Sequence, residues 1–241
     1  MDRSSLGRAV PGPTSIRAVF FDFGGTIVEE IDFDQWVASG RSLGLTLDPE
    51  RLVHAWKEVE AIADRDPSVS VEAFCARVLS ETIGQPVSAD VVDRFLSLER
   101  SGPRAYRLYS DVVRCLDALR ARRLELGILS NSLRSEAELR ETIDRLGLRR
   151  YFRWVISSAT EGVRKPSSEL FRRAAERARL APSEILYVGN LPETDARGAA
   201  RAGLRSVWLH RDGTGFGDDP PEITSLLEVP LVLDRLAAGE S

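Results

Sequence analysis

The sequence predicts an α/β fold in which a parallel sheet carries helices on both faces and a small bundle of helices is inserted near the start of the chain. Three observations lead to this prediction. Short apolar runs of strand length alternate with amphipathic segments of helix length over most of the 241 residues. The alternation stops between residues 32 and 103, where every segment has a helical pattern. Polar, chemically active residues directly follow four of the expected elements.

The first expected strand covers residues 16–23 (IRAVFFDF), a run rich in strand-forming residues that ends at Gly24-Gly25. Similar runs predict further strands over residues 124–129, 154–157, 185–188 and 206–209. Helical patterns between them cover residues 111–122, 135–146, 167–179 and 194–202. Because right-handed crossovers join parallel strands, this order predicts a Rossmann-like sheet whose strands all end along one rim, where ligands bind.

The stretch without strands predicts a second domain. We expect residues 32–103 to form a helical cap, and residues 16–31 and 104–241 to form the α/β core. Helical segments within the cap are expected over residues 34–43, 49–63, 69–83 and 89–99, since Pro49 suits a first helical turn and Gly44 and Gly84 follow expected ends. Residues 1–15 are expected to be flexible, and residues 211–241 to form a Gly/Pro-rich loop, a short helix and one more apolar segment.

The composition indicates a globular protein that binds neither membranes nor nucleic acid. Hydrophobic residues make up 43 % and charged residues 29 %, and the net charge of −4 comes with no basic run. No apolar run approaches the ~20 residues that a membrane-spanning helix needs. Cys75 and Cys115 lie in helix-patterned segments and are expected to be buried and reduced, so we expect a cytoplasmic protein. The pattern leaves the oligomeric state open.

Lysine is rare in this chain. Of 33 basic residues only Lys57 and Lys165 are lysines, so a basic side chain is nearly always arginine. A lysine ammonium is a compact charge, and a tight anionic pocket can distinguish it from the broad arginine fork. Lys165 is therefore a candidate for a specific role, whereas Lys57, on an amphipathic segment of the cap, is expected to be solvated or paired.

Four short polar segments are expected to meet at the rim of the sheet. Together they supply the carboxylate of Asp22, the hydroxyl of Ser130, the ammonium of Lys165 and the carboxylate of Asp195. A carboxylate at an open strand end can attack phosphorus, and a hydroxyl with neighbouring backbone amides can bind phosphoryl oxygens. An ammonium neutralises the charge of the transition state, and a second carboxylate allows Mg²⁺ to be shared with a phosphorylated substrate. These residue types therefore indicate phosphoryl transfer.

In their order and positions, the segments Asp-Phe-Gly-Gly-Thr, Ser-Asn, Lys-Pro and Gly-Asn-x-x-x-x-Asp resemble the four motifs of the haloacid-dehalogenase-like hydrolase superfamily. The resemblance spans residues 17–236, and the helical insert is similar to that superfamily's cap. It implies a Mg²⁺-dependent phosphatase that acts on a small phosphorylated metabolite through an aspartyl-phosphate at Asp22. It further implies catalytic roles for Asp22, Ser130 and Lys165, substrate binding by Gly24, Gly25, Thr26 and Asn131, and metal binding by Asp22, the Gly24 carbonyl, Asn190 and Asp195.

Two positions depart from the superfamily's phosphatase pattern. Gly24 stands where most such phosphatases carry a second aspartate, which acts as general acid and base and contributes ~10²–10⁴-fold to the rate. Glu29 and His54 are candidates to replace it, and acyl or aryl phosphates, with their acidic leaving groups, should suffer least. Asn190 stands in place of an aspartate, which lowers the charge of the ligand set by one and predicts weakly bound Mg²⁺.

Three alternative functions stay open. A 2-haloacid dehalogenase also lacks the second aspartate, and in it Asp22 would attack carbon without a metal; the Gly-Asn-x-x-x-x-Asp spacing and the small residue at Gly24 argue against it. Lys57 makes cleavage of a carbon–phosphorus bond through a Schiff base conceivable. Because acidic groups are missing at both Gly24 and Asn190, the chain also suits a protein that binds a phosphorylated ligand or a partner without turnover.

Overall fold

The computed structural model describes residues 15–29, 33–63, 65–66, 69–101, 106–132, 134–213 and 220–239. Almost all of the N-terminal segment predicted to be flexible, residues 1–15, lies outside this range. The predicted boundaries between core and cap, near residues 31–32 and 103–104, also fall outside it, as does the middle of the Gly/Pro-rich loop. The division into two domains therefore stays a prediction at its edges.

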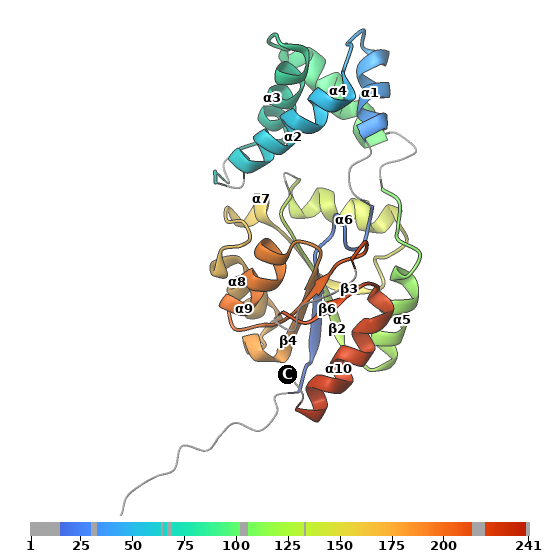
Figure 1. Ribbon diagram of the computed structural model, residues 1–241, viewed down its shortest axis with the longest axis vertical. Coiled ribbons are helices and arrows are strands. Elements are labelled where there is room, and N and C mark those ends of the chain that lie inside the picture. Colours follow the sequence, from blue (N-terminus) through green and yellow to red (C-terminus); the bar gives the residue numbers. More distant parts are fainter. Residues whose placement is uncertain are drawn as a thin grey trace, which may run out of the picture.

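A six-stranded parallel sheet forms the centre of the larger part of the molecule, in the order β3-β2-β1-β4-β5-β6 (Figure 1). The predicted α/β fold class is confirmed. The strands are β1 (Ala18–Phe21), β2 (Glu125–Ser130), β3 (Phe152–Ser157), β4 (Ile185–Gly189), β5 (Arg205–Leu209) and β6 (Glu222–Ile223). The first five lie in or beside the predicted runs. The short β6 was not predicted, because two residues paired with the end of β5 are too few to produce a periodic pattern.

Helices cover both faces of the sheet, as predicted. Those that follow or flank the strands are α5 (Val112–Ala121), α6 (Glu136–Arg145), α7 (Ser158–Glu161), α8 (Ser168–Ala178), α9 (Arg197–Arg201) and α10 (Val229–Ala238). Successive residues of β1 point to opposite faces, as in any strand. Val19 and Phe21 join the apolar cluster that contains α5, α6 and α10, whereas Ala18 and Phe20 join the cluster that contains α8 and α9.

Polar side chains set the helix starts on the sheet. At α6, the Ser135 hydroxyl accepts the Glu138 N–H while the Glu138 carboxylate accepts the Ser135 N–H, a reciprocal cap. A single π-helical turn, η2 (Pro192–Ala196), precedes α9, and it holds Asp195, the last residue of the fourth predicted motif. Such turns are rare in proteins, and those that occur often lie at functional sites.

Helices α1 (Phe33–Ser42), α2 (Pro49–Ala63), α3 (Val71–Ile83) and α4 (Ala89–Ser101) form a four-helix bundle with a core of its own. The aromatic rings of Trp36, Trp56, Phe74 and Phe95 meet edge to face there, with centroids 4.7–5.1 Å apart. The bundle lies beyond the end of the sheet to which the strands point (Figure 1). It therefore faces the rim that the sequence analysis identified.

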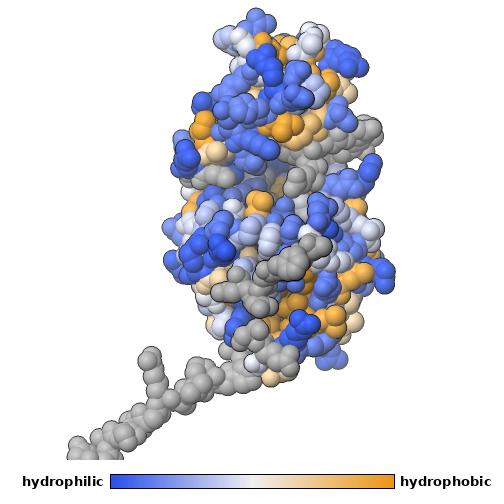
Figure 2. Space-filling view, in the orientation of Figure 1, coloured by the Kyte–Doolittle hydropathy of each residue, from blue (hydrophilic) through white to orange (hydrophobic). Residues whose placement is uncertain are grey.

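The visible surface is mostly hydrophilic, and both cysteines are buried. Hydrophilic residues cover most of the face in Figure 2, with apolar residues in small groups. No helix in the described ranges combines the length and apolar character that crossing a membrane would need. Cys75 lies in the core of the bundle and Cys115 in the core beside the sheet, and burial raises the pKa of each thiol to about 12. Both are buried free thiols, as predicted.

Candidate active site

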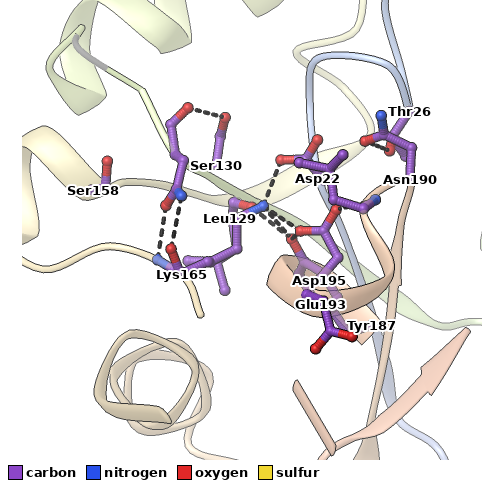
Figure 3. Close-up of polar contacts among 12 residues, drawn as sticks. Asp22, Thr26, Leu129, Ser130, Ser158, Lys165, Tyr187, Asn190, Glu193 and Asp195 are labelled. Carbon is purple, nitrogen blue, oxygen red and sulfur yellow. Dashed lines mark hydrogen bonds and ion pairs between the residues drawn. The ribbon is translucent and has the colours of Figure 1, made fainter. Parts of the chain in front are cut away.

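Side chains from four distant segments meet at the carboxyl end of the sheet (Figure 3). Asp22 directly follows β1, and its N–H donates to the Val188 carbonyl of the neighbouring strand β4 (2.9 Å). Ser130 ends β2, Lys165 lies in the loop between α7 and α8, and Asp195 lies in the π-helical turn after β4. Because adjacent parallel strands are in register here, these segments share one rim.

The Lys165 ammonium is the centre of the site. Its Nζ lies 2.6 Å from Oδ1 of Asp22 and 2.6 Å from Oδ1 of Asp195. The Lys165 side chain is 2 % exposed and that of Asp195 is fully buried, whereas the Asp22 side chain retains 10 % exposure. Of the two carboxylates, Asp22 is thus the one that remains accessible from the rim. This is the position that a nucleophile requires.

Tyr187 of β4 completes the surroundings of the ammonium. Its hydroxyl accepts a hydrogen bond from Lys165 Nζ (2.9 Å) and lies 2.9 Å from the Leu129 carbonyl oxygen and 3.3 Å from Asp195 Oδ1. Asp195 is held from the other side, since its Oδ2 accepts the Leu191 N–H (2.9 Å). Lys165 therefore donates to three oxygens, which uses the three donors of an ammonium.

The electrostatics of the site follow from two carboxylates sharing one cation. Burial raises the pKa of Asp22 from 3.8 to about 6, and the Asp195 charge adds to the rise, while Lys165 opposes it. Burial by itself would lower the pKa of Lys165, but the charges of Asp195 and Asp22 outweigh it and the pKa is raised. Lys165 is thus kept protonated, and the site carries one uncompensated negative charge whenever both carboxylates are ionised.

Asn131 fixes the backbone that carries Lys165. Its Oδ1 accepts the Lys165 N–H (2.8 Å), and its Nδ2 donates to the Lys165 carbonyl (2.9 Å). The role of Asn131 in substrate binding stays a prediction, and in this structure its amide side chain is engaged with Lys165. Ser130 is 5 % exposed, and its hydroxyl donates to the carbonyl of the next residue (3.3 Å).

The loop that follows Asp22 is packed closely on one side and open on the other. Gly25 has φ +73°, and a Cβ there would collide with the Asn190 side chain. The Thr26 hydroxyl, fully buried, lies 3.3 Å from Asn190 Oδ1 and donates to it. By contrast, a Cβ at Gly24 would meet no heavy atom within 4 Å. The Cβ of a larger residue at position 24 would therefore meet open space.

The two residues proposed as substitutes for that carboxylate have other partners. Glu29 follows the loop after Asp22 (residues 23–28, called the nucleophile loop after the predicted role of Asp22), and its carboxylate lies 3.7 Å from the Arg107 guanidinium. His54 is on α2, with a side chain 76 % exposed and 3.3 Å from Glu58. Lys57, on the same helix, is also exposed. A role for any of them in catalysis stays a prediction.

The oxygen donors at the site suit a weakly held Mg²⁺. The described residues include no cluster of three or more His, Cys, Asp or Glu side chains that would hold a metal by themselves. Mg²⁺, however, is often held by one or two carboxylates, with water and substrate phosphate supplying the rest. The carboxylates of Asp22 and Asp195, which both contact Lys165, fit that description. Metal binding by the Gly24 carbonyl and by Asn190, whose Oδ1 accepts the Thr26 hydroxyl, stays a prediction. The uncompensated negative charge favours a cation as well.

Two contributors were missed by the sequence analysis. Tyr187 belongs to the predicted apolar strand, and a tyrosine hydroxyl in a fully buried strand was the available signal, since such a hydroxyl requires a partner. Trp208 of β5 donates its indole N–H to the Asn190 carbonyl (3.0 Å), which fixes the loop after β4. No sequence motif predicts this contact, because it depends on the pairing of β4 with β5.

Comparisons with known proteins agree on one fold for this chain. A family model described as haloacid dehalogenase-like hydrolase matches residues 16–203. Phosphoserine phosphatase of Thermus thermophilus is 35 % identical over 158 residues, which are 66 % of this chain and 60 % of that protein, so less than two thirds of that relative is matched. (S)-2-haloacid dehalogenase 2 of Pseudomonas sp. (strain CBS-3) is 24 % identical over 92 % of this chain and 98 % of that protein. The crystal structure of a 2-haloacid dehalogenase from Pseudomonas syringae pv. Tomato matches with a TM-score of 0.67 and 26 % identity, covering 91 % and 99 % of the two chains.

The raised pKa of Asp22 leads to a prediction about stability. In the unfolded chain the carboxyl titrates near 3.8 and in the fold at about 6, so the native state binds more protons between these values and stability falls as the pH rises through them. The shift corresponds to roughly 3 kcal/mol at most. In metal-free protein at pH 8, Asp22→Asn should therefore have a larger free energy of unfolding than the wild type, by up to about 3 kcal/mol, because Lys165 keeps Asp195 as its partner. Urea titrations at pH 4 and pH 8 check this; an equal difference at both pH values would contradict it.

Proposed function

The chain belongs to the haloacid dehalogenase-like hydrolase family, and on that premise we propose that it is a phosphatase acting on a small phosphorylated metabolite. Asp22 serves as the covalent nucleophile. The proposal is supported above all by one observation: the Asp22 carboxylate lies at the open rim, oriented by a buried ammonium that bonds a second carboxylate at the same distance. The 35 % identity to a phosphoserine phosphatase supports it from the sequence.

The proposed reaction has two steps. An oxygen of the Asp22 carboxylate attacks phosphorus, the bond from phosphorus to the leaving oxygen breaks, and the leaving group takes that electron pair. Water then attacks the phosphorus of the aspartyl-phosphate, which releases inorganic phosphate and restores the carboxylate. Lys165 holds Asp22 in place and neutralises charge on the phosphoryl oxygens, and the Ser130 hydroxyl donates to one of them. Gly24, Gly25 and Thr26 supply the loop against which the phosphoryl group lies.

Mg²⁺ is part of the proposal. The residues that would hold it are Asp22, the Gly24 carbonyl, Asn190 and Asp195, and bound Mg²⁺ would offset the negative charge of both nucleophile and substrate. Asn190 supplies a neutral oxygen where a carboxylate would bind more strongly. We therefore expect weak metal binding and activity that rises with Mg²⁺ over the millimolar range.

The substrate class follows from what the site lacks. No described carboxylate other than Asp195 is bonded to the ammonium beside Asp22, and Asp195 is fully buried and hydrogen bonded on both oxygens. Asp195 is thus poorly placed to protonate a leaving group. Phosphates whose leaving oxygen departs as a stable anion, such as aryl and acyl phosphates, need this proton least. These are the substrates we propose.

The second candidate is a dehalogenase, supported by a relative of that name that matches 92 % of this chain. In that reaction Asp22 attacks the carbon that bears the halogen, the carbon–halogen bond breaks, and water hydrolyses the resulting ester. A halide leaves without a proton, so an open Gly24 position is no disadvantage. The bundle would serve as a cap over either kind of substrate, excluding water while the covalent intermediate forms.

One assay separates the two candidates. Aryl and acyl phosphates and 2-haloacids are each incubated with the protein in Mg²⁺ and in EDTA, beside Asp22→Asn. We expect phosphate release that EDTA abolishes and that falls at least ~10³-fold in the variant, because the nucleophile is gone. Halide release that EDTA leaves unchanged would establish the dehalogenase instead. Ligand binding without turnover of either class would rule out both.

The open space at Gly24 allows a gain-of-function test. Gly24→Asp should raise kcat for an alkyl phosphate by ~10–10²-fold, since it adds a general acid where nothing obstructs the side chain. The increase for p-nitrophenyl phosphate, which needs little acid catalysis, should be smaller. Gly24→Ala is the matched control and should leave both rates near those of the wild type. Gly25→Ala, which would collide with Asn190, should lower both. Equal gains for the two substrates would count against a role as general acid.

Asn190 governs the strength of metal binding in this proposal. Asn190→Asp adds a carboxylate to the ligand set, so the Mg²⁺ concentration for half-maximal activity should fall by roughly tenfold. The measurement is the initial rate of phosphate release over a range of Mg²⁺ concentrations. Since the Thr26 hydroxyl can donate to either residue, the loop should keep its conformation. An unchanged Mg²⁺ requirement would mean that Asn190 is not a ligand.

A further inference from the structure

Arg211, two residues beyond the end of β5, makes a set of contacts that no motif accounts for. Its Nη2 donates to the Thr26 carbonyl (2.7 Å) and to Asp111 Oδ1 (3.2 Å), and its Nη1 donates to Asp111 Oδ2 (3.0 Å). The guanidinium also lies over the Tyr109 ring, 3.6 Å from its centroid. One planar group thus joins the nucleophile loop to the segment that returns from the bundle.

Asp111 is itself held firmly. Its Oδ2 accepts the Ser225 hydroxyl (2.8 Å) and the Leu226 N–H (2.9 Å) in addition to the Arg211 hydrogen bond. Burial alone would raise the pKa of Asp111, but the hydrogen bonds from Arg211, Ser225 and Leu226 lower it. The side chains of Arg211 and Asp111 are 16 % and 9 % exposed, so this bidentate pair is largely shielded from water. It forms a fixed point against which the loop can be held.

Hydrogen bonds within the loop, from the Gly25 N–H to the Val28 carbonyl (2.8 Å) and from the Ile27 N–H to the Phe23 carbonyl (2.9 Å), shape it locally, and Arg211 attaches it to the segment after β5. Thr26 is four residues after Asp22, and its hydroxyl reaches Asn190 at 3.3 Å, the upper end of hydrogen-bond distance. The Arg211 bond to the Thr26 carbonyl is shorter and is supported by the Asp111 pair. The Tyr109 N–H meanwhile donates to the Ile27 carbonyl (3.3 Å), so the ring under the guanidinium is attached to the same loop.

We propose that Arg211 is a positioning residue for the reaction: with Asp111 and Tyr109 it fixes the Gly24–Thr26 backbone and thereby the direction from which Asp22 meets its substrate. This rests on the proposed function of Asp22 as nucleophile. The role requires a planar fork, since two parallel donors face the carboxylate while one also reaches the carbonyl. A lysine ammonium cannot match that arrangement. Arg211 touches no reacting atom, so it acts through the loop alone.

The test compares Arg211→Gln and Arg211→Lys with the wild type in kcat, KM and backbone exchange. With p-nitrophenyl phosphate and Mg²⁺, both variants should lose ~10–10²-fold in kcat, because a small displacement of the nucleophile is costly, while KM changes less than about threefold. Amide hydrogen–deuterium exchange of residues 25–29 should become faster in both. Arg211→Lys keeps the charge beside Asp111, so it carries the test if the glutamine variant does not fold.

Ser225→Ala is the matched control. It removes one hydrogen bond to Asp111 from the same C-terminal segment but leaves the contacts of Arg211 with Thr26 and Tyr109 in place. It should lower the melting temperature while kcat stays within about twofold of the wild type and exchange of residues 25–29 is unchanged. A loss of kcat in Ser225→Ala as large as in the arginine variants would overturn the proposal, because destabilisation alone would then explain it.

The exchange measurement separates this inference from the proposed function. If the wild-type protein released no phosphate from any substrate, the proposed function would fail, yet exchange would still decide whether Arg211 fixes the loop. Wild-type exchange rates at residues 25–29 in both arginine variants would overturn the positioning role whatever the activity. Faster exchange with unaltered kcat would overturn it too, since the loop would then move without consequence for the reaction.

Discussion

The sharing of one buried ammonium by two carboxylates is the interaction on which the rest of the site depends. Lys165 comes from a loop after α7, Asp22 from the end of β1 and Asp195 from the turn after β4, and each of the three would be costly to bury without the others. Asn131 and Tyr187 serve this arrangement, the first by holding the Lys165 backbone and the second by taking the third hydrogen bond of the ammonium. In the proposed function, the charge that remains uncompensated is what favours a cation beside the two carboxylates.

Much of this was predictable because it depends on local patterns. The strand at residues 16–23 is predictable from its run of strand-forming residues. A parallel sheet then brings the residues after each strand to one rim, whatever the details of packing. The conspicuous Lys165 was recognised by its rarity. Contacts set by the packing of segments distant in sequence were not predictable: the Tyr187 hydroxyl finds its partners only when β4 lies beside β1, and Arg211 meets Thr26 across 185 positions of chain. The strand β6 was not predictable from the sequence, because its two residues form a strand only by pairing with β5.

Membership of the family does not by itself decide the function of this chain. Relatives named as a phosphatase and as a dehalogenase both resemble it, so the fold does not distinguish the two functions. Two positions of this chain depart from the phosphatase pattern described in the sequence analysis. Gly24 leaves room where a phosphatase of the usual pattern would place an acid, and Asn190 replaces a charged ligand by a neutral one. Both changes reduce the negative charge of the site without disturbing the Lys165 arrangement.

The segment that leaves the sheet after Asp22 and the segment that returns towards it lie side by side at residues 28–29 and 107–108. Val28 pairs with Leu108 in an antiparallel bridge, and the Glu29 N–H donates to the Arg107 carbonyl (2.8 Å). Strands β1 and β2 remain direct neighbours in register although the whole bundle lies between them in the sequence. The continuity of the sheet, and with it the placement of the groups at its rim, therefore does not depend on the length or shape of the inserted helices.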